Sequence, residues 1–136
     1  MNKSISNGVN PKTSHRGKQI LLVEDDPLLI DIYTTKFKEA GFAVEVADSG
    51  AYVLKKAKEV KPDLIILDIV LPHVNGWEVL ENIRKDEELA AIKVIILSNL
   101  GQKEEIEKGM KLGADLYLIK AHYTPSQVVR EVTKLL

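Results

Sequence analysis

The sequence predicts an α/β fold in which a doubly wound, five-stranded parallel sheet is covered by helices on both faces. Short, continuous apolar runs recur along the chain, as is typical of strands that are buried on both faces. Segments with helical apolar spacing follow these runs after short connections. This alternation favours parallel strands joined by helical crossovers. The length of 136 residues suits one domain.

The first strand and the first helix are marked at their ends. The run QILLV, residues 19–23, is apolar after its first residue and is followed directly by acidic residues. Pro27 suits the first turn of the next helix, and Gly41 suits the position just past its end. Asp26 precedes the proline and is expected to cap that helix.

The remaining elements repeat this alternation. Further strands are predicted at residues 43–47, 63–68, 93–98 and 115–120. Further helices are predicted at residues 51–60, 76–86, 103–113 and 125–136. Residues 1–17 are polar and have no apolar period, so they are predicted to be a disordered tail or a linker. The folded domain is expected to span residues 18–136.

The composition narrows the classes of function. The formal net charge of −1 gives no reason to expect direct binding to nucleic acid or to a membrane surface. The absence of cysteine excludes disulfides, thiolate zinc sites and cysteine nucleophiles. No apolar run is long enough to span a bilayer. We therefore expect a soluble, cytoplasmic domain.

Polar residues stand at the carboxyl ends of four predicted strands, and these ends meet at one edge of a parallel sheet, where such folds bind their ligands. They are Glu24 and Asp25, then Asp68, Ser98 and Lys120. The three carboxylates would repel one another unless positive charge lies between them. Lys120 supplies one positive charge. A bound metal ion would supply more, and carboxylate oxygens, which are hard ligands, favour Mg²⁺ or Mn²⁺. A carboxylate nucleophile beside these groups would suit phosphoryl transfer.

Four segments resemble the receiver domain of two-component response regulators: LLVEDDP, LIILDIVLPHVNGWEVL, VIILSNL and ADLYLIK. The resemblance covers about residues 19–136. It implies a flavodoxin-like (βα)5 fold with strand order 2-1-3-4-5. It also implies that Asp68 accepts a phosphoryl group from a histidine kinase or a histidine phosphotransfer protein.

The resemblance assigns a metal site to the chain. Glu24 and Asp25 match the acidic pair that holds Mg²⁺ together with the phosphorylated aspartate, Asp68. The backbone carbonyl of Val70 matches the main-chain metal ligand.

The resemblance also assigns a switch. Ser98 matches the hydroxyl that follows the phosphoryl group, Lys120 the lysine that pairs with it, and Tyr117 the aromatic residue that swings inward. The surface formed by residues 102–136 would then dock a downstream protein or a second copy. Apart from its own phosphorylation and a slow self-dephosphorylation, the chain is not expected to be an enzyme.

Several positions depart from the family pattern. Ala121 follows the lysine where a proline is usual. A cis peptide bond is costly before a residue other than proline, so we expect a rearranged loop in which the bond is either trans or strained. Asn99 stands where a small residue is usual and would narrow access to the site. Val70 and Leu100 are apolar at positions that tune the phosphoryl lifetime, which predicts slow hydrolysis.

Two other functions remain open from the sequence. The first is a protein-binding pseudo-receiver that acts without phosphorylation, which the departures at Asn99 and Ala121 would allow. The second is a phosphatase of the haloacid dehalogenase type, which also uses an aspartate nucleophile and Mg²⁺. That family requires a second acid two residues after the first, and Val70 occupies this place.

Overall fold

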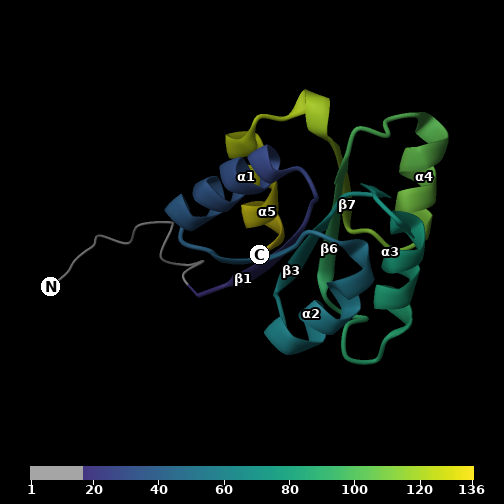
Figure 1. The fold of residues 1–136 in the computed structure, drawn as a ribbon. Coiled ribbons are helices and arrows are strands. Elements are labelled where there is room, and N and C mark those ends of the chain that lie inside the picture. Colours follow the sequence, from purple (N-terminus) through teal and green to yellow (C-terminus); the bar gives the residue numbers. More distant parts are fainter. Residues whose placement is uncertain (1–16) are drawn as a thin grey trace, which may run out of the picture.

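The computed structural model describes residues 17–136, so residues 1–16 of the predicted tail lie outside the described residues. One parallel sheet of five strands runs through its centre (Figure 1), in the order β2-β1-β3-β6-β7. Counting only these five strands, this is the predicted order 2-1-3-4-5, and the flavodoxin-like fold is confirmed. The strands are β1 Gln19–Val23, β2 Ala43–Ala47, β3 Leu64–Leu67, β6 Lys93–Ser98 and β7 Leu116–Ile119.

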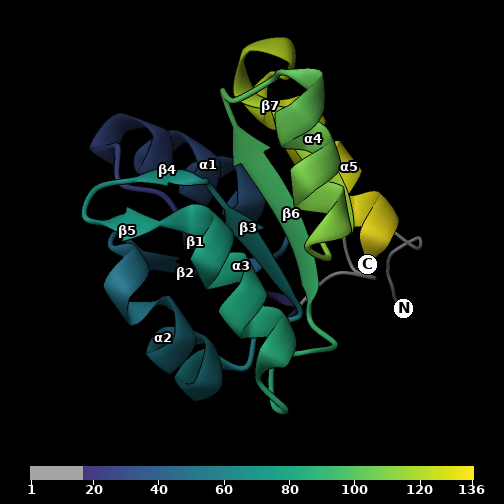
Figure 2. The same ribbon diagram turned by 90° about the vertical axis from the view of Figure 1, so that its right-hand side faces the viewer.

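Helices cover both faces of the sheet, α1 and α5 on one side and α2, α3 and α4 on the other (Figures 1 and 2). They are α1 Pro27–Glu39, α2 Val53–Val60, α3 Gly76–Lys85, α4 Lys103–Lys111 and α5 Pro125–Leu135. The predicted cap of α1 is present, because the Asp26 carboxylate accepts hydrogen bonds from Leu28 N and Leu29 N. In the part of the chain that the structure describes, no helix is both long and apolar enough to cross a membrane.

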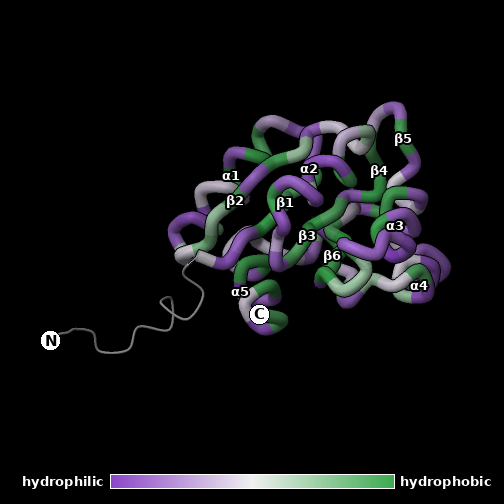
Figure 3. The backbone as a smooth tube through the Cα atoms, turned by 90° about the horizontal axis from the view of Figure 1, so that it is seen from below, coloured by the Kyte–Doolittle hydropathy of each residue, from purple (hydrophilic) through white to green (hydrophobic). Residues whose placement is uncertain are grey.

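The three central strands divide their side chains between two apolar cores. In β1, for example, Ile20 and Leu22 pack with α1 and α5, whereas Leu21 and Val23 face the opposite core. The strands β3 and β6 alternate in the same way, because successive side chains of a strand point to opposite faces. Figure 3 shows hydrophobic residues along β3 and β6, in the middle of the fold. These buried strands hold their carboxyl ends rigidly at one edge of the sheet.

The structure contains short elements that the sequence did not predict. The strands β4, Val70–Leu71, and β5, Val74–Asn75, form an antiparallel hairpin that begins two residues after Asp68. Its turn places His73 in the left-handed region, with φ 65°, which costs a residue other than glycine some conformational energy. A 3-10 turn, η2 Gly50–Tyr52, precedes α2.

The prediction that the last strand reaches residue 120 was wrong. The strand β7 ends at Ile119, and Lys120 begins the 3-10 turn η3, Lys120–His122. The backbone pairing of β6 with β7 ends at Ser98 and Ile119, so Lys120 has no strand partner. The peptide bond from Lys120 to Ala121 is trans, which decides between the two alternatives that the sequence left open.

Candidate functional site

The Lys120 ammonium lies between two buried carboxylates at the carboxyl edge of the sheet. Its Nζ is 2.6 Å from Asp68 Oδ2 and 2.7 Å from Glu24 Oε1. Glu24 is 2% exposed and Asp68 is 5% exposed. Charges this well buried are stable only when they are paired and hydrogen-bonded, and here one ammonium pairs with both acids.

Backbone amides complete the hydrogen bonding of these two acids. Glu24 Oε2 accepts from the N–H groups of Asp25 and Asp26, each at 3.2 Å. Asp68 Oδ1 accepts from Val70 N at 3.0 Å. The turns that follow β1 and β3 therefore fix the orientation of both carboxylates.

The surroundings of Lys120 favour its charged form. Burial alone would lower the pKa of the ammonium, but the hydrogen bonds to Asp68 and Glu24 outweigh this effect, so the pKa is raised above its ordinary value. Lys120 is therefore a permanent positive charge at neutral pH. It offsets one of the two negative charges that it contacts.

The carboxylates of Glu24, Asp25 and Asp68 converge, with one oxygen of each lying within 4.8 Å of the others. They open onto a pocket of about 360 Å³, whose wall also includes Val70. Asp25 is exposed, so this carboxylate is accessible from solvent. Three hard oxygen ligands beside open space fit a divalent cation such as Mg²⁺ or Mn²⁺, which keeps several waters when it binds protein.

Ser98 and Tyr117 each form a hydrogen bond with the backbone of Leu100. Ser98 is completely buried, and its Oγ accepts a hydrogen bond from Leu100 N at 3.3 Å. The Tyr117 hydroxyl donates to the Leu100 carbonyl. Burial raises the pKa of Tyr117 to about 12, and the negative charges of Glu105 and Asp68 contribute to this shift. The phenol is therefore a hydrogen-bond donor at all physiological pH values.

Comparison with known proteins decides the family. Residues 20–133 match the response regulator receiver domain family over most of the chain. The chain belongs to this family. It is a receiver domain of a two-component response regulator.

Relatives and solved structures agree with this assignment. The domain is 39% identical over 102 residues to the DNA-binding dual master transcriptional regulator RpaA of Synechocystis, covering 75% of this chain and 42% of RpaA. It is 35% identical over 121 residues to the alkaline phosphatase synthesis transcriptional regulatory protein PhoP of Bacillus subtilis, covering 88% of this chain and 48% of PhoP. The chain thus spans about half the length of these curated relatives. The receiver domain of Francisella response regulator 1452 superposes with a TM-score of 0.80 at 30% identity, covering 88% of this chain and 96% of that chain.

The receiver domain contains a contact at the site that the sequence did not predict. The Asn99 side chain accepts a hydrogen bond from the backbone N–H of Ala121 at 3.1 Å. Both residues depart from the family pattern, and the sequence gives no sign that they are connected. The two residues are far apart in sequence, and the pairing of β6 with β7 brings them together.

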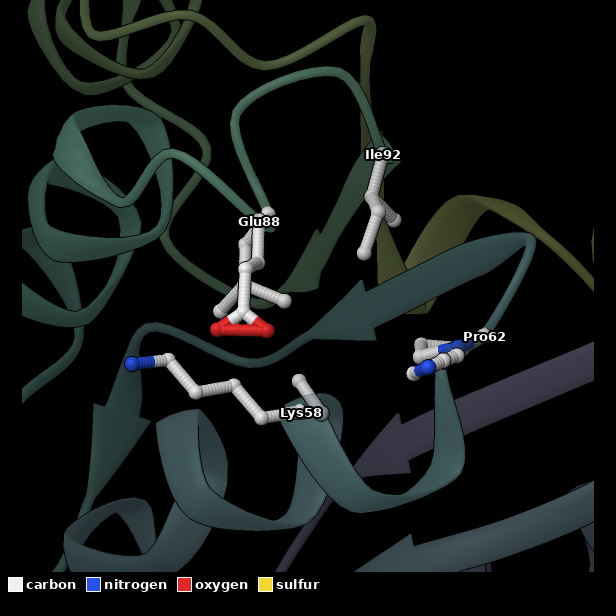
Figure 4. A pocket seen from close by; sticks show the side chains of 7 residues that line it. Lys58, Pro62, Glu88 and Ile92 are labelled. Carbon is white, nitrogen blue, oxygen red and sulfur yellow. The ribbon is translucent and has the colours of Figure 1, made fainter.

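A second pocket of the receiver domain, of about 400 Å³, lies at the opposite end of the sheet, where β3 and β6 begin (Figure 4). Its wall is formed by Ala57, Lys58, Lys61, Pro62, Glu88, Leu89 and Ile92. Lys58 is already paired with Asp86 at 2.8 Å. With Glu88 as its one carboxylate, this pocket does not offer the cluster of acids found at the carboxyl edge.

Proposed function

We propose that the chain is a phosphoacceptor in histidine-to-aspartate signalling and that Asp68 carries the phosphoryl group. The observation that supports this most directly is the convergence of three carboxylates and one ammonium around a solvent-accessible pocket. In the transfer, an Asp68 oxygen forms a bond to phosphorus while the bond to a histidine nitrogen of the donor breaks. The proton that this nitrogen requires comes from solvent.

The residues around Asp68 have separate roles in this proposal. Lys120 already contacts the Asp68 carboxylate, so it is placed to pair with oxygens of a phosphoryl group attached there. The Ser98 hydroxyl follows the phosphoryl group. Glu24, Asp25, Asp68 and the backbone carbonyl of Val70 would hold Mg²⁺, or Mn²⁺ in its place. A bound divalent cation would neutralise charge on the transferring oxygens.

The output in this proposal is a change on the surface of residues 102–136. A shift of Ser98 toward the phosphoryl group would break its bond to Leu100 N. Leu100 is also bound by Tyr117, so the two residues respond together. This surface would then dock a downstream protein or a second copy of the chain. We infer that the phosphodonor is a histidine kinase or a histidine phosphotransfer protein.

The lifetime of the phosphorylated form is proposed to be long. Val70 is 57% exposed at the wall of the pocket, and its apolar side chain cannot orient a water molecule for attack on phosphorus. Leu100 is equally unable to do so. Decay over seconds, rather than many minutes or longer, would contradict this part of the proposal.

Treatment with acetyl phosphate and Mg²⁺ tests the proposed function. Intact-mass measurement should show the addition of one phosphoryl group, and peptide mapping should place it on Asp68. Asp68→Asn is the matched control because it keeps the size of the side chain and removes the nucleophile. A chain that folds but gains no phosphoryl group would instead be a pseudo-receiver, and the proposal would be wrong.

A further inference from the structure

The Ala121 N–H donates a hydrogen bond to Asn99 Oδ1 at 3.1 Å, next to the site. Asn99 directly follows Ser98, and Ala121 directly follows Lys120. The bond therefore joins the two segments that carry the hydroxyl and the ammonium of the site. Asn99 also lines the pocket into which the acids open.

The backbone around Lys120 depends on this contact for support. The ladder between β6 and β7 ends at Ser98 and Ile119, so the Ala121 N–H cannot be satisfied by the sheet. It also lies in the first turn of η3, where backbone N–H groups have no partner within the helix. Ile119, which precedes the turn, has an apolar side chain and cannot cap it. Asn99 supplies the missing acceptor from the neighbouring segment.

The two residues form a matched pair. Asparagine provides an acceptor that reaches across from β6, and alanine provides an N–H that proline at the same position would lack. Either residue alone would give no bond. The pair extends the β6–β7 pairing by one side-chain contact, beyond the point where backbone pairing ends.

We propose that Asn99 is a positioning residue that acts through Ala121 to hold Lys120 in register with Asp68 and Glu24. The pair of Asn99 and Ala121, here named the latch, fixes the backbone next to Lys120. The Nζ of Lys120 contacts two different acids at 2.6 and 2.7 Å. The Lys120 side chain is only 12% exposed, so the atoms around it limit how far it can readjust when its backbone moves. Asn99 therefore affects the binding of a phosphoryl group through the position of Lys120.

Two substitutions separate positioning from steric access. Asn99→Leu keeps much of the bulk of the side chain and removes the acceptor, whereas Asn99→Ala removes both. If the latch positions Lys120, both variants should bind beryllofluoride, a phosphoryl mimic, about 2- to 10-fold more weakly at fixed Mg²⁺, which is the range expected for one lost hydrogen bond. Asn82→Ala, at an exposed asparagine on α3, is the control and should leave the affinity unchanged.

Amide hydrogen exchange provides the second readout. Exchange at the Ala121 N–H should be faster in both Asn99 variants than in the wild-type chain. Asn99→Asp keeps an acceptor in the same place and should restore the slow exchange. This measurement needs no phosphoryl chemistry, so it tests the latch even if the proposed function fails.

The outcomes distinguish the two proposals. If the wild-type chain does not bind beryllofluoride, the proposed function fails, and exchange at the Ala121 N–H then decides on the latch. Unchanged exchange in both Asn99 variants would show that the latch does not hold this backbone. If the wild-type chain binds and both Asn99 variants bind equally well, the positioning role is wrong. Tighter binding by Asn99→Ala together with unchanged binding by Asn99→Leu would show that Asn99 restricts access, and would also overturn it.

Discussion

Ser98 and Tyr117 are joined through the backbone of one residue. The Leu100 N–H donates to Ser98 Oγ at 3.3 Å, and the Tyr117 hydroxyl donates to the Leu100 carbonyl. The loop between β6 and α4 is thus held from both sides. If Ser98 moved away from Leu100 N, the loop would lose one of these two bonds and keep the one from the Tyr117 hydroxyl.

Replacing Tyr117 by phenylalanine should weaken this connection. The variant loses one hydrogen bond and leaves the Leu100 carbonyl without its donor, so the free energy of unfolding should fall by about 1 kcal/mol. Urea denaturation measures the change. Tyr52→Phe is the matched control, because Tyr52 is 64% exposed and should have little effect. Equal stability of the two variants would contradict the prediction.

The same phenol predicts a loss of stability at alkaline pH. The pKa of Tyr117 is raised to about 12, above its unfolded value of about 10. The unfolded chain therefore loses this proton first as the pH rises. The contribution of the phenol to stability is complete below about pH 10 and is lost progressively toward pH 12. Subtracting the absorbance titration of Tyr117→Phe from that of the wild type should leave one tyrosinate step near pH 12.

Removing the ammonium of Lys120 should destabilise the fold and make it depend on divalent cations. In Lys120→Met, Glu24 and Asp68 remain buried without a counter-charge, at an expected cost of about 3–5 kcal/mol. Millimolar Mg²⁺ should recover part of this loss in urea denaturation. Lys134→Met is the control, since Lys134 pairs with Glu131 at 3.1 Å on the surface and should cost under about 1 kcal/mol. A similar cost for both variants would show that Lys120 is not needed to balance the acids.

Arg84 joins three segments at the other end of the sheet. Its guanidinium donates to the carbonyls of Gly113 at 2.9 Å and Ile92 at 2.7 Å and to the Asp115 carboxylate at 3.1 Å. In Arg84→Lys the single ammonium cannot reach all of these acceptors, so the free energy of unfolding should fall by about 2 kcal/mol. The exposed Arg130→Lys should change it by less than about 0.5 kcal/mol.

Gly76 allows α3 to begin against the segment that follows Asp68. A Cβ at this position would lie 2.4 Å from the Ile69 carbonyl oxygen and 2.5 Å from Ile69 Cα. Because this contact is with backbone, Gly76→Ala should cost about 3 kcal/mol in thermal or urea unfolding. Gly101→Ala would meet side-chain atoms of Ile119 and no backbone, with Cδ1 nearest at 2.9 Å, and should be much milder. An equal cost would contradict the prediction.

The sequence predicted the elements whose pattern is local. The predicted strands at residues 19–23, 43–47 and 93–98 have the same ends as the observed β1, β2 and β6. Such strands can be predicted because their apolar residues are adjacent in sequence. The acids, Ser98 and Lys120 could be placed at one edge because parallel strands share a direction. The hairpin β4–β5 was missed because each strand has only two residues.

Contacts between distant residues could not be predicted in this way. The bonds of Tyr117 to Leu100 and of Asn99 to Ala121 depend on the register between β6 and β7, and the sequence contains no local signal for that register. The side-chain bonds of Arg84 have the same origin. The sequence therefore predicts where the charged groups of the site lie. It does not predict the hydrogen bonds that hold the residues around them.

The alternation of side chains along β1, β3 and β6 has a consequence for how this chain can change over time. Ile20 and Leu22 contribute to one interior and Leu21 and Val23 to the other, so the backbone of the sheet separates the two. A substituted side chain in the core under α4 contacts different residues from one in the core under α1. Substitutions can therefore accumulate on one flank of the molecule while the packing of the opposite flank stays unchanged.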